Sequence, residues 1–246
     1  MTLHITWCDN AAFRLDRKGQ TIWFDPAVNK NPDSPVKVDD ICDPAKFVFT
    51  THGDPGHFVN SIEITKKTGA HFVGPADLCE VILQKQLLSQ AQLIPLDFGE
   101  TKMIDDLEVY LFEAIHPELT DERREVVRKW GGAIETRNSG FVVRSEDFTL
   151  CLLGDSVYSD VFKDIGQKFS IDFGMIPIQG KSKGSPIEEA VESGAAIVRD
   201  LNVKFLFPVI QYTREFSYID PLKRKLKEMG SETQLIFDKP GVVYTF

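Results

Sequence analysis

The spacing of hydrophobic and polar positions predicts a chain that opens with short strands and then alternates helices with strands. In the first 25 residues, brief apolar runs indicate three strands, and a polar turn containing Gly19 separates the last two. Farther along, apolar side chains recur at helical spacing in several segments. The expected strands cover residues 3–7, 11–15, 21–25, 47–51, 70–73, 107–114, 140–144, 148–153, 172–178, 204–209, 234–237 and 242–246. The expected helices cover residues 59–68, 77–88, 186–201 and 221–229.

This order of elements predicts an α/β fold. Strands in two clusters with helices between them imply a sandwich of two sheets covered by helices on its outer faces. No stretch rich in Pro, Gly and Ser divides the 246 residues, so we expect a single domain over 1–246. The strand-then-helix order recurs loosely in both halves without a repeated sequence motif.

Composition and charge narrow the class of partner. Hydrophobic residues make up 42% and charged residues 26% of the chain, as in an ordinary globular protein. The net charge of −9 argues against nucleic acid or an anionic membrane as the main partner, and favours a small-molecule substrate. The N-terminus lacks the basic and apolar regions of a signal peptide, and no long apolar run occurs, so we expect a cytoplasmic protein without a membrane span.

The cysteines indicate neither a disulfide framework nor a thiolate zinc site. They are far apart and form no CxxC pair, so we expect each to be a small buried side chain. The four are Cys8, Cys42, Cys79 and Cys151.

Candidate chemistry gathers in the segment Thr51-His52-Gly53-Asp54-Pro55-Gly56-His57, directly after an apolar strand. An Asp-Pro-Gly turn can aim the imidazoles of His52 and His57 and the carboxylate of Asp54 toward one point. Imidazole and carboxylate together form a ligand set for zinc, iron or manganese. Taken alone, the segment also fits a simple turn whose histidines cap neighbouring backbone groups.

Two further candidates lie at the ends of other predicted strands. His116 follows the strand over 107–114, and Asp155 follows the strand over 148–153 in Gly154-Asp155-Ser156. Side chains just after separate strands are where sheets in α/β proteins place their sites. His4 and His71 lie inside predicted strands and are expected on strand faces rather than in the site.

The order of these segments resembles the metallo-β-lactamase superfamily over nearly the whole chain, and within it the metal-dependent hydrolases similar to ascorbate 6-phosphate lactonase. The matching segments are Asp25-Pro26, Thr51 to His57, His116, Gly154-Asp155-Ser156 and Gln211-Tyr212 after Phe207-Pro208. The resemblance implies an αββα sandwich of two mixed sheets flanked by helices. It also makes a homo-oligomer plausible.

The sequence departs from the family pattern at three positions. The family's loop reads T-H-x-H-x-D-H, so Asp54 stands where the second histidine belongs and Gly56 where the loop aspartate belongs. Gln211 stands where the final histidine belongs. Carried over residue by residue, the resemblance implies a first metal site of His52, Asp54, His116 and the bridging Asp155.

The second metal site of the family would keep few ligands, namely His57, Asp155 and the weak amide ligand Gln211. We therefore expect one divalent ion rather than two, and zinc, manganese and iron all remain candidates because Asp54 adds a harder oxygen ligand.

The leading interpretation is a hydrolase in which a metal-bound water attacks an ester, lactone, amide or phosphoester bond of a small substrate. An anionic small molecule is one candidate for this substrate. Asp155 and His57 are the candidate catalytic residues, with Asp155 orienting the water in place of the missing loop carboxylate. One alternative is a catalytically inactive member that binds a ligand or a partner. Another is a redox iron site, suggested by the carboxylate of Asp54.

Two segments are secondary candidates. The predicted helix from Thr120 to Trp130 follows His116 and is either a lid or a solvated surface helix. The loop from Lys181 to Ser185 opens a helix, where it either binds an anion through its backbone N–H groups or is simply an exposed loop.

Overall fold

The computed structural model describes residues 2–29, 34–119, 121, 125, 136–182, 185–209 and 216–246. The chain forms two compact units, each built on one seven-stranded mixed sheet. The first unit comprises Met1–Phe98, Val127–Arg137 and Asp238–Phe246, and the second comprises Gly99–Val126 and Asn138–Phe237.

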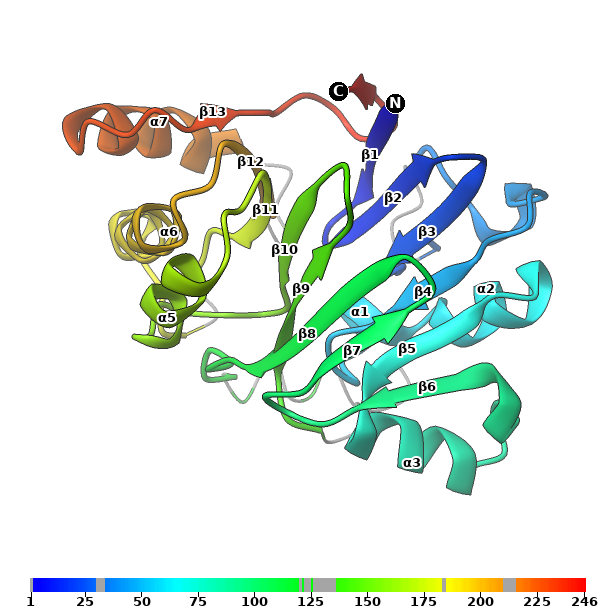
Figure 1. Cartoon of the computed structure of the whole chain (residues 1–246). Helices are drawn as coiled ribbons and strands as arrows, with labels where there is room; N and C mark the ends of the chain where they lie inside the picture. The colour runs from blue at the N-terminus through cyan, green and yellow to red at the C-terminus, as the bar shows by residue number, and fades with distance from the viewer. Residues whose placement is uncertain are drawn as a thin grey trace. The chain divides into compact units, whose positions relative to one another are not determined.

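The sheet of the first unit combines an antiparallel half with a parallel half (Figure 1). Its strands follow the order β14 (Val243–Thr245), β1 (Leu3–Asp9), β2 (Ala12–Arg17), β3 (Gln20–Phe24), β4 (Phe47–Phe49), β5 (His71–Pro75) and β6 (Leu93–Leu96). Pairing is antiparallel from β14 to β3 and parallel from β3 to β6. The predicted turn joins β2 to β3 through Lys18 and Gly19, both with positive φ, because such tight hairpins need left-handed residues.

Short helices cover the parallel half of this sheet. They are α1 (Pro55–Phe58), α2 (Ser61–Thr68) and α3 (Ala76–Gln84), with single 3₁₀ turns at Val38–Asp40 and Gln90–Gln92. Helix α2 packs on β4 and β5, and α3 packs on β5 and β6. The apolar faces bury Ile64 of α2 and Leu78 and Ile82 of α3 completely, which fixes both helices on the strands that precede them.

The second unit repeats this plan with a second mixed sheet. Its strands follow the order β13 (Gln234–Leu235), β12 (Phe205–Val209), β11 (Phe173–Pro177), β10 (Thr149–Leu153), β9 (Ser139–Arg144), β8 (Leu107–Glu113) and β7 (Thr101–Ile104). Pairing is antiparallel from β7 to β10 and parallel from β10 to β13. The loose recurrence noted in the sequence therefore reflects two similar sheets.

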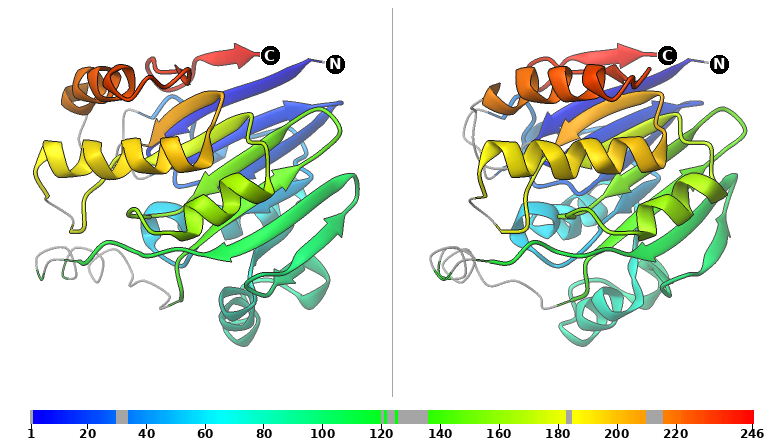
Figure 2. Two further views of the ribbon diagram at one scale, coloured as in Figure 1. Left: turned by 60° about the vertical axis from the view of Figure 1, so that its left-hand side comes forward. Right: turned by 90° about the vertical axis from the view of Figure 1, so that its left-hand side faces the viewer.

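The described helices of this unit include α5 (Val161–Lys168), α6 (Ile187–Leu201) and α7 (Ile219–Glu228), with a 3₁₀ turn at Phe216–Tyr218 before α7. Figure 2 shows α6 running beside α5 and α7, and both neighbours contact it. Their apolar side chains join the buried faces of β9 to β12 in one cluster that includes Phe162, Ile197 and Leu222.

The predicted fold class, two mixed sheets flanked by helices, is confirmed. Most predicted elements are present with shifted ends; the helix expected at residue 59, for example, begins at Ser61 after the separate turn of α1. Sequence reasoning missed β6, β7 and α5. Strand β6 contains Pro95, which is tolerated because β6 lies at the sheet edge, and α5 contains Gly166, a poor helix former.

One expectation about the cysteines is wrong. Cys8, Cys79 and Cys151 are buried as expected, whereas Cys42 is exposed, in the segment that leads from the first 3₁₀ turn to β4. His4 on β1 and the exposed His71 on β5 are strand residues, as expected.

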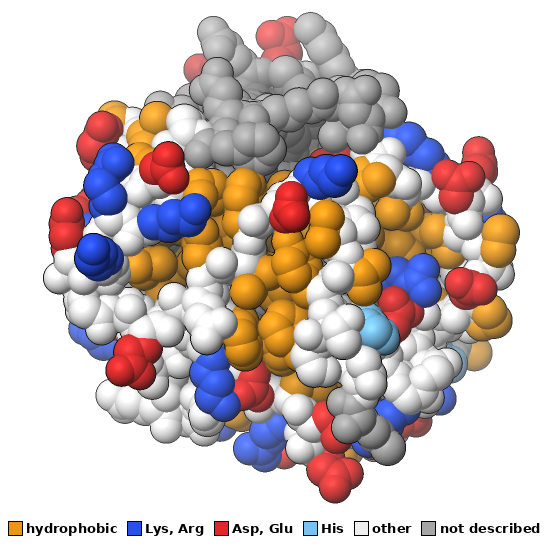
Figure 3. Space-filling model, turned by 90° about the horizontal axis from the view of Figure 1, so that it is seen from above, with side chains coloured by type: hydrophobic (Ala, Val, Ile, Leu, Met, Phe, Trp, Pro, Cys, Tyr) orange, Lys and Arg blue, Asp and Glu red, His pale blue; other side chains and the backbone are white. Residues whose placement is uncertain are grey.

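On the face shown in Figure 3, Lys and Arg side chains are interspersed with Asp and Glu rather than gathered in one field. Among the described helices, none is both long enough and apolar enough to cross a membrane.

Candidate metal centre

The loop that carries His52 and Asp54 connects the buried strand β4 to the short helix α1. Asp54 has extended backbone angles at the N-cap position, and Pro55 follows as the first helical residue, where its missing N–H costs nothing. The carbonyl of Asp54 accepts from the N–H groups of His57 and Phe58 at 2.9 Å each. This turn places His57 on the helix while His52 and Asp54 stay on the loop.

Asp25, the residue after β3, ties this loop together. It is fully buried, and its Oδ1 accepts from the N–H of Thr51 at 2.8 Å. Its Oδ2 accepts from Thr51 Oγ1 at 2.8 Å and lies 2.8 Å from Nδ1 of His57. Charge-assisted hydrogen bonds of this kind are the strong ones, so one carboxylate fixes the loop and the helix against each other.

These contacts determine which nitrogen of each imidazole carries the proton. Because a carboxylate only accepts, Nδ1 of His57 donates to Asp25. The single hydroxyl proton of Thr51 also goes to Asp25, so its oxygen accepts from Nδ1 of His52, 3.0 Å away. In the neutral imidazoles of His52 and His57, Nε2 therefore carries the lone pair, as metal ligands require.

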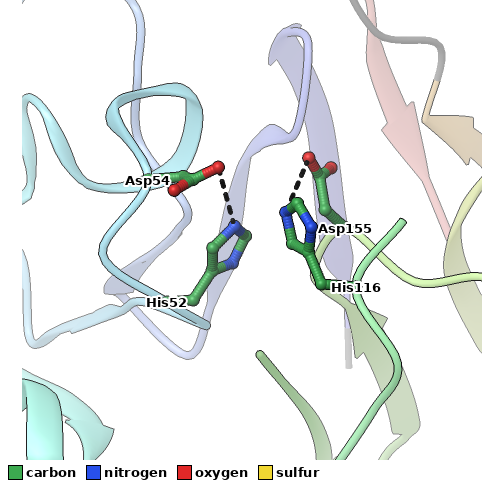
Figure 4. Close-up of side chains that lie close together, drawn as sticks. All are labelled: His52, Asp54, His116 and Asp155. Carbon is green, nitrogen blue, oxygen red and sulfur yellow. Dashed lines mark ion pairs between the residues drawn. The ribbon is translucent and has the colours of Figure 1, made fainter. Parts of the chain in front are cut away.

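The imidazole of His52 faces the carboxylate of Asp54 (Figure 4). Nε2 of His52 lies 3.8 Å from Oδ2 of Asp54, and the His52 side chain is only 3% exposed. The rings of His52 and His57 are neighbours, with centroids 4.2 Å apart. Three of the residues singled out in the sequence thus lie close together within the first unit.

The second unit carries a matching pair. His116 follows β8 and Asp155 follows β10, and Nε2 of His116 lies 3.6 Å from Oδ2 of Asp155 (Figure 4). Nδ1 of His116 lies 2.6 Å from the carbonyl oxygen of Pro117, which can only accept, so here too Nε2 carries the lone pair of the neutral ring. The carboxylate of Asp155 is nearly fully buried.

Within each pair, the separation of the two side chains fits a cation held between them. A lone pair and a carboxylate that face each other without a proton or a cation between them repel, so each arrangement calls for one or the other. Two ligand atoms about 2.1 Å from one ion at a tetrahedral angle lie about 3.4 Å apart. The observed separations of 3.8 Å and 3.6 Å are close to that value and too long for direct hydrogen bonds.

The remaining sequence candidates have different outcomes. Gln211, most of the predicted 120–130 helix, and Lys183 and Gly184 of the predicted anion loop lie outside the described residues. In the rest of that loop, Glu189 Oε1 accepts from the N–H of Lys181 at 2.7 Å and from Ser185 Oγ at 3.1 Å. A carboxylate of the chain itself therefore uses these two donors at the start of α6, which argues against the anion-binding reading of this loop.

Sequence reasoning missed two residues that organise the centre. The predicted strand over 21–25 includes Asp25, whereas β3 ends at Phe24, so the strand-end position that marks the other candidates did not single out Asp25. Asn138 precedes β9, and its Nδ2 lies 2.8 Å from the carbonyl oxygen of Asp155. No sequence signal marked Asn138, because its role depends on the order of strands in the sheet.

The fold agrees with the comparison with known families. The model of the β-lactamase superfamily domain matches residues 4–210, and the chain belongs to this family. The narrower resemblance to ascorbate 6-phosphate lactonase stays a prediction.

Relatives in other organisms match over almost their full length. The chain is 27% identical to a UPF0173 metal-dependent hydrolase of Methanopyrus kandleri, covering 98% of this chain and 99% of the relative. It is 29% identical to a metal-dependent hydrolase of Pyrobaculum islandicum, covering 97% and 98%. The structure of a metallo hydrolase from Ignicoccus hospitalis superposes with a TM-score of 0.78 at 20% identity, covering 100% and 99%, which shows the shared fold.

Proposed function

We propose that the protein is a metal-dependent hydrolase in which His52, Asp54, His116 and Asp155 hold one divalent ion. The observation that carries the proposal is the donor set. Two imidazoles present Nε2 lone pairs, each toward a carboxylate of its own unit, and the four side chains form a group of suitable composition for a metal ion. Membership of the β-lactamase superfamily and relatives described as metal-dependent hydrolases support the same activity.

When bound, the metal would supply Lewis-acid chemistry that lowers the pKa of a coordinated water toward about 7. Two nitrogen and two oxygen donors suit zinc, manganese and iron, and we propose one of these. The substrate we propose is a small molecule with an ester, lactone, amide or phosphoester bond.

The chain's own residues divide the remaining work. Asp155 has two oxygens, so it can contact the ion through one and accept a hydrogen bond from the attacking water through the other. Gly56, the second residue of α1, has no side chain to supply the loop carboxylate of the family. His57, held by Asp25, presents Nε2 as a further ligand or proton acceptor, and Gln211 is the proposed weak ligand of the vestigial second position.

The proposal is tested by elemental analysis of the purified protein together with a His116→Ala variant. We expect about one equivalent of a transition metal in the wild type, and a large loss in the variant because one of four ligands is gone. His71→Ala is the matched control, because His71 is an exposed histidine on β5 and its loss should leave the metal content unchanged.

Hydrolysis is then measured with metal-loaded protein on a panel of esters, lactones, amides and phosphoesters. Turnover that depends on the metal and on His116 supports the hydrolase. A wild type that carries no metal and takes up no zinc, manganese or iron overturns it, and leaves an inactive ligand-binding member of the family as the better account.

A further inference from the structure

His116 and Asp155 come from strands that are not neighbours. They follow β8 and β10, and β9 lies between these two strands in the sheet. Strands in a sheet are about 4.8 Å apart, so β8 and β10 are separated by roughly 9.6 Å. The loops and side chains that follow the two strands therefore have to span this gap, and they do so with Nε2 of His116 3.6 Å from Oδ2 of Asp155.

Asn138 lies directly before β9, between the loops that follow β8 and β10. Because β9 is antiparallel to both neighbours, the residue before it lies at the carboxyl ends of β8 and β10. The carbonyl of Asn138 accepts from the N–H of Ala114 at 3.2 Å, and the carbonyl of Ser139 accepts from the N–H of Gly154 at 3.2 Å. The backbone at the start of β9 is thus attached to both loops.

The side chain of Asn138 joins the two loops a second time. Its Nδ2 donates to the carbonyl of Asp155 at 2.8 Å, and lies 3.3 Å from the carbonyl of Ala114 and 3.2 Å from Ser156 Oγ. Asn138 is only 6% exposed, so water does not compete for these contacts. One amide nitrogen therefore links the residue two positions before His116 to the ligand Asp155 itself.

The amide oxygen of the Asn138 side chain argues against a role in stability alone. Oδ1 of Asn138 is buried, and no donor in the described part of the chain reaches it. A buried acceptor without a partner costs stability, and such groups in native proteins call for an explanation. Turning the amide over would direct its oxygen at two carbonyls, so the nitrogen's contacts fix its orientation.

We propose that Asn138 is a positioning residue that holds Asp155 at the separation from His116 that a shared metal ion requires. The inference rests on the proposed function, because it concerns the affinity of the same centre. Asn138 does not touch the ion and acts through the backbone of the ligand Asp155. Its loss should let the two loops spread apart and weaken metal binding.

The test compares metal affinity with stability in Asn138→Ala. The dissociation constant for Zn²⁺ is measured by competition with a chelator, and thermal unfolding is measured on the metal-free protein. We expect the dissociation constant to rise about 10- to 100-fold, the usual effect of losing a group that orients a metal ligand. Asn138→Ser, which keeps one donor, should recover part of the affinity, and it also serves if Asn138→Ala does not fold.

Gln179→Ala is the matched control. Gln179 is another buried amide that donates to the same turn, through a 3.1 Å hydrogen bond from Nε2 to the carbonyl of Ser156. Its loss should lower thermal stability while shifting the dissociation constant less than about threefold, because the contacts of Asn138 with both ligand loops remain.

The outcomes separate this inference from the proposed function. If the wild type binds Zn²⁺ and the affinity of Asn138→Ala is unchanged, or falls no more than that of Gln179→Ala, Asn138 is merely structural and the inference is wrong while the metal centre stands. If the wild type binds no Zn²⁺, Mn²⁺ or Fe²⁺, the proposed function fails and this inference fails with it.

Discussion

Oδ2 of Asp25 lies 2.8 Å from Nδ1 of His57, inside a region from which water is excluded. The same carboxylate holds Thr51, whose oxygen accepts from Nδ1 of His52. A single buried charge thus fixes the tautomer of two imidazoles, one directly and one through a hydroxyl. A neutral histidine offers Nε2 as a metal ligand only when its proton is on Nδ1. In both rings this Nδ1–H donates a hydrogen bond to the network around Asp25.

Replacing Asp25 by Asn should therefore weaken metal binding. The left-handed backbone at residue 25, with φ of 43°, suits Asn as well as Asp, so the backbone is preserved. If the new amide keeps its oxygen on the N–H of Thr51, its nitrogen donates to Oγ1 of Thr51, and the Thr51 hydroxyl proton turns to Nδ1 of His52. The proposed ligand His52 would then carry its proton on Nε2, and we expect a rise of about 10- to 100-fold in the Zn²⁺ dissociation constant.

Asp16→Asn is the control for this prediction. Asp16 is a partly exposed aspartate on β2 that accepts hydrogen bonds from Arg14 and Thr21, so its loss also removes a charge from the first unit. Equal effects of the two substitutions on metal affinity would show that Asp25 acts only through net charge.

The sequence singles out the main proposed ligands because each follows an apolar strand. His52, His116 and Asp155 all lie within three residues of a strand end, and β4, β8 and β10 have apolar runs that a simple pattern detects. The order of the strands within each sheet is a property of the folded chain. For that reason the pattern could not show that β9 separates β8 from β10, nor that Asn138 must bridge them.

Elements at the edges of the sheets were the hardest to predict. Strands β6 and β7 are four residues long and lie at the edges, where one side of the strand needs no partner and polar residues or Pro95 are tolerated. Helix α5 has only eight residues and includes Gly166, so its intrinsic helical preference is weak and packing against α6 decides it.

Substituting Gly166 by Ala should destabilise the protein, although Ala is the better helix former. A Cβ at residue 166 would clash with the carbonyl oxygen of Asp200, a backbone atom of α6 that cannot move aside on its own. The two helices would have to separate, which we expect to lower the free energy of unfolding by about 2 kcal/mol or more. Urea unfolding measures this, and Gln167→Ala, at an exposed position on the same helix, should change it by less than about 0.5 kcal/mol. A stability of Gly166→Ala equal to wild type would rule out the close approach of α5 and α6.

Thiol labelling of the native protein should modify one cysteine of the four. Cys42 is exposed, whereas burial raises the pKa of Cys8 to about 12 and also raises the pKa of Cys151. The thiolate is the reactive form, so the buried thiols should react only when the chain unfolds. Cys42→Ser should abolish the fast reaction, and full labelling should appear in denaturant. Rapid labelling of a second thiol in native Cys42→Ser would contradict the buried positions of the others.

Asp200 should make the stability of the second unit depend on acid pH. Oδ1 of Asp200 accepts from Nε of Arg199 at 2.6 Å, and Oδ2 accepts from the hydroxyl of Tyr158 at 2.8 Å. These hydrogen bonds, that of Arg199 foremost, lower the pKa of Asp200 in the folded protein below its ordinary value. A lowered folded pKa means that the stabilisation is complete above the pKa of the unfolded chain, about 3.9, and is lost as the pH falls through the folded pKa.

The measurement is the free energy of urea unfolding at about pH 6 and about pH 3 for the wild type and Asp200→Asn. The wild type should lose more stability than the variant between these two conditions, because the variant has no carboxylate to protonate at residue 200. Asp164→Asn, at an exposed position in the first turn of α5, should retain the pH dependence of the wild type. If Asp200→Asn and the wild type lose equal stability on acidification, the contacts with Arg199 and Tyr158 do not favour the ionised form of Asp200.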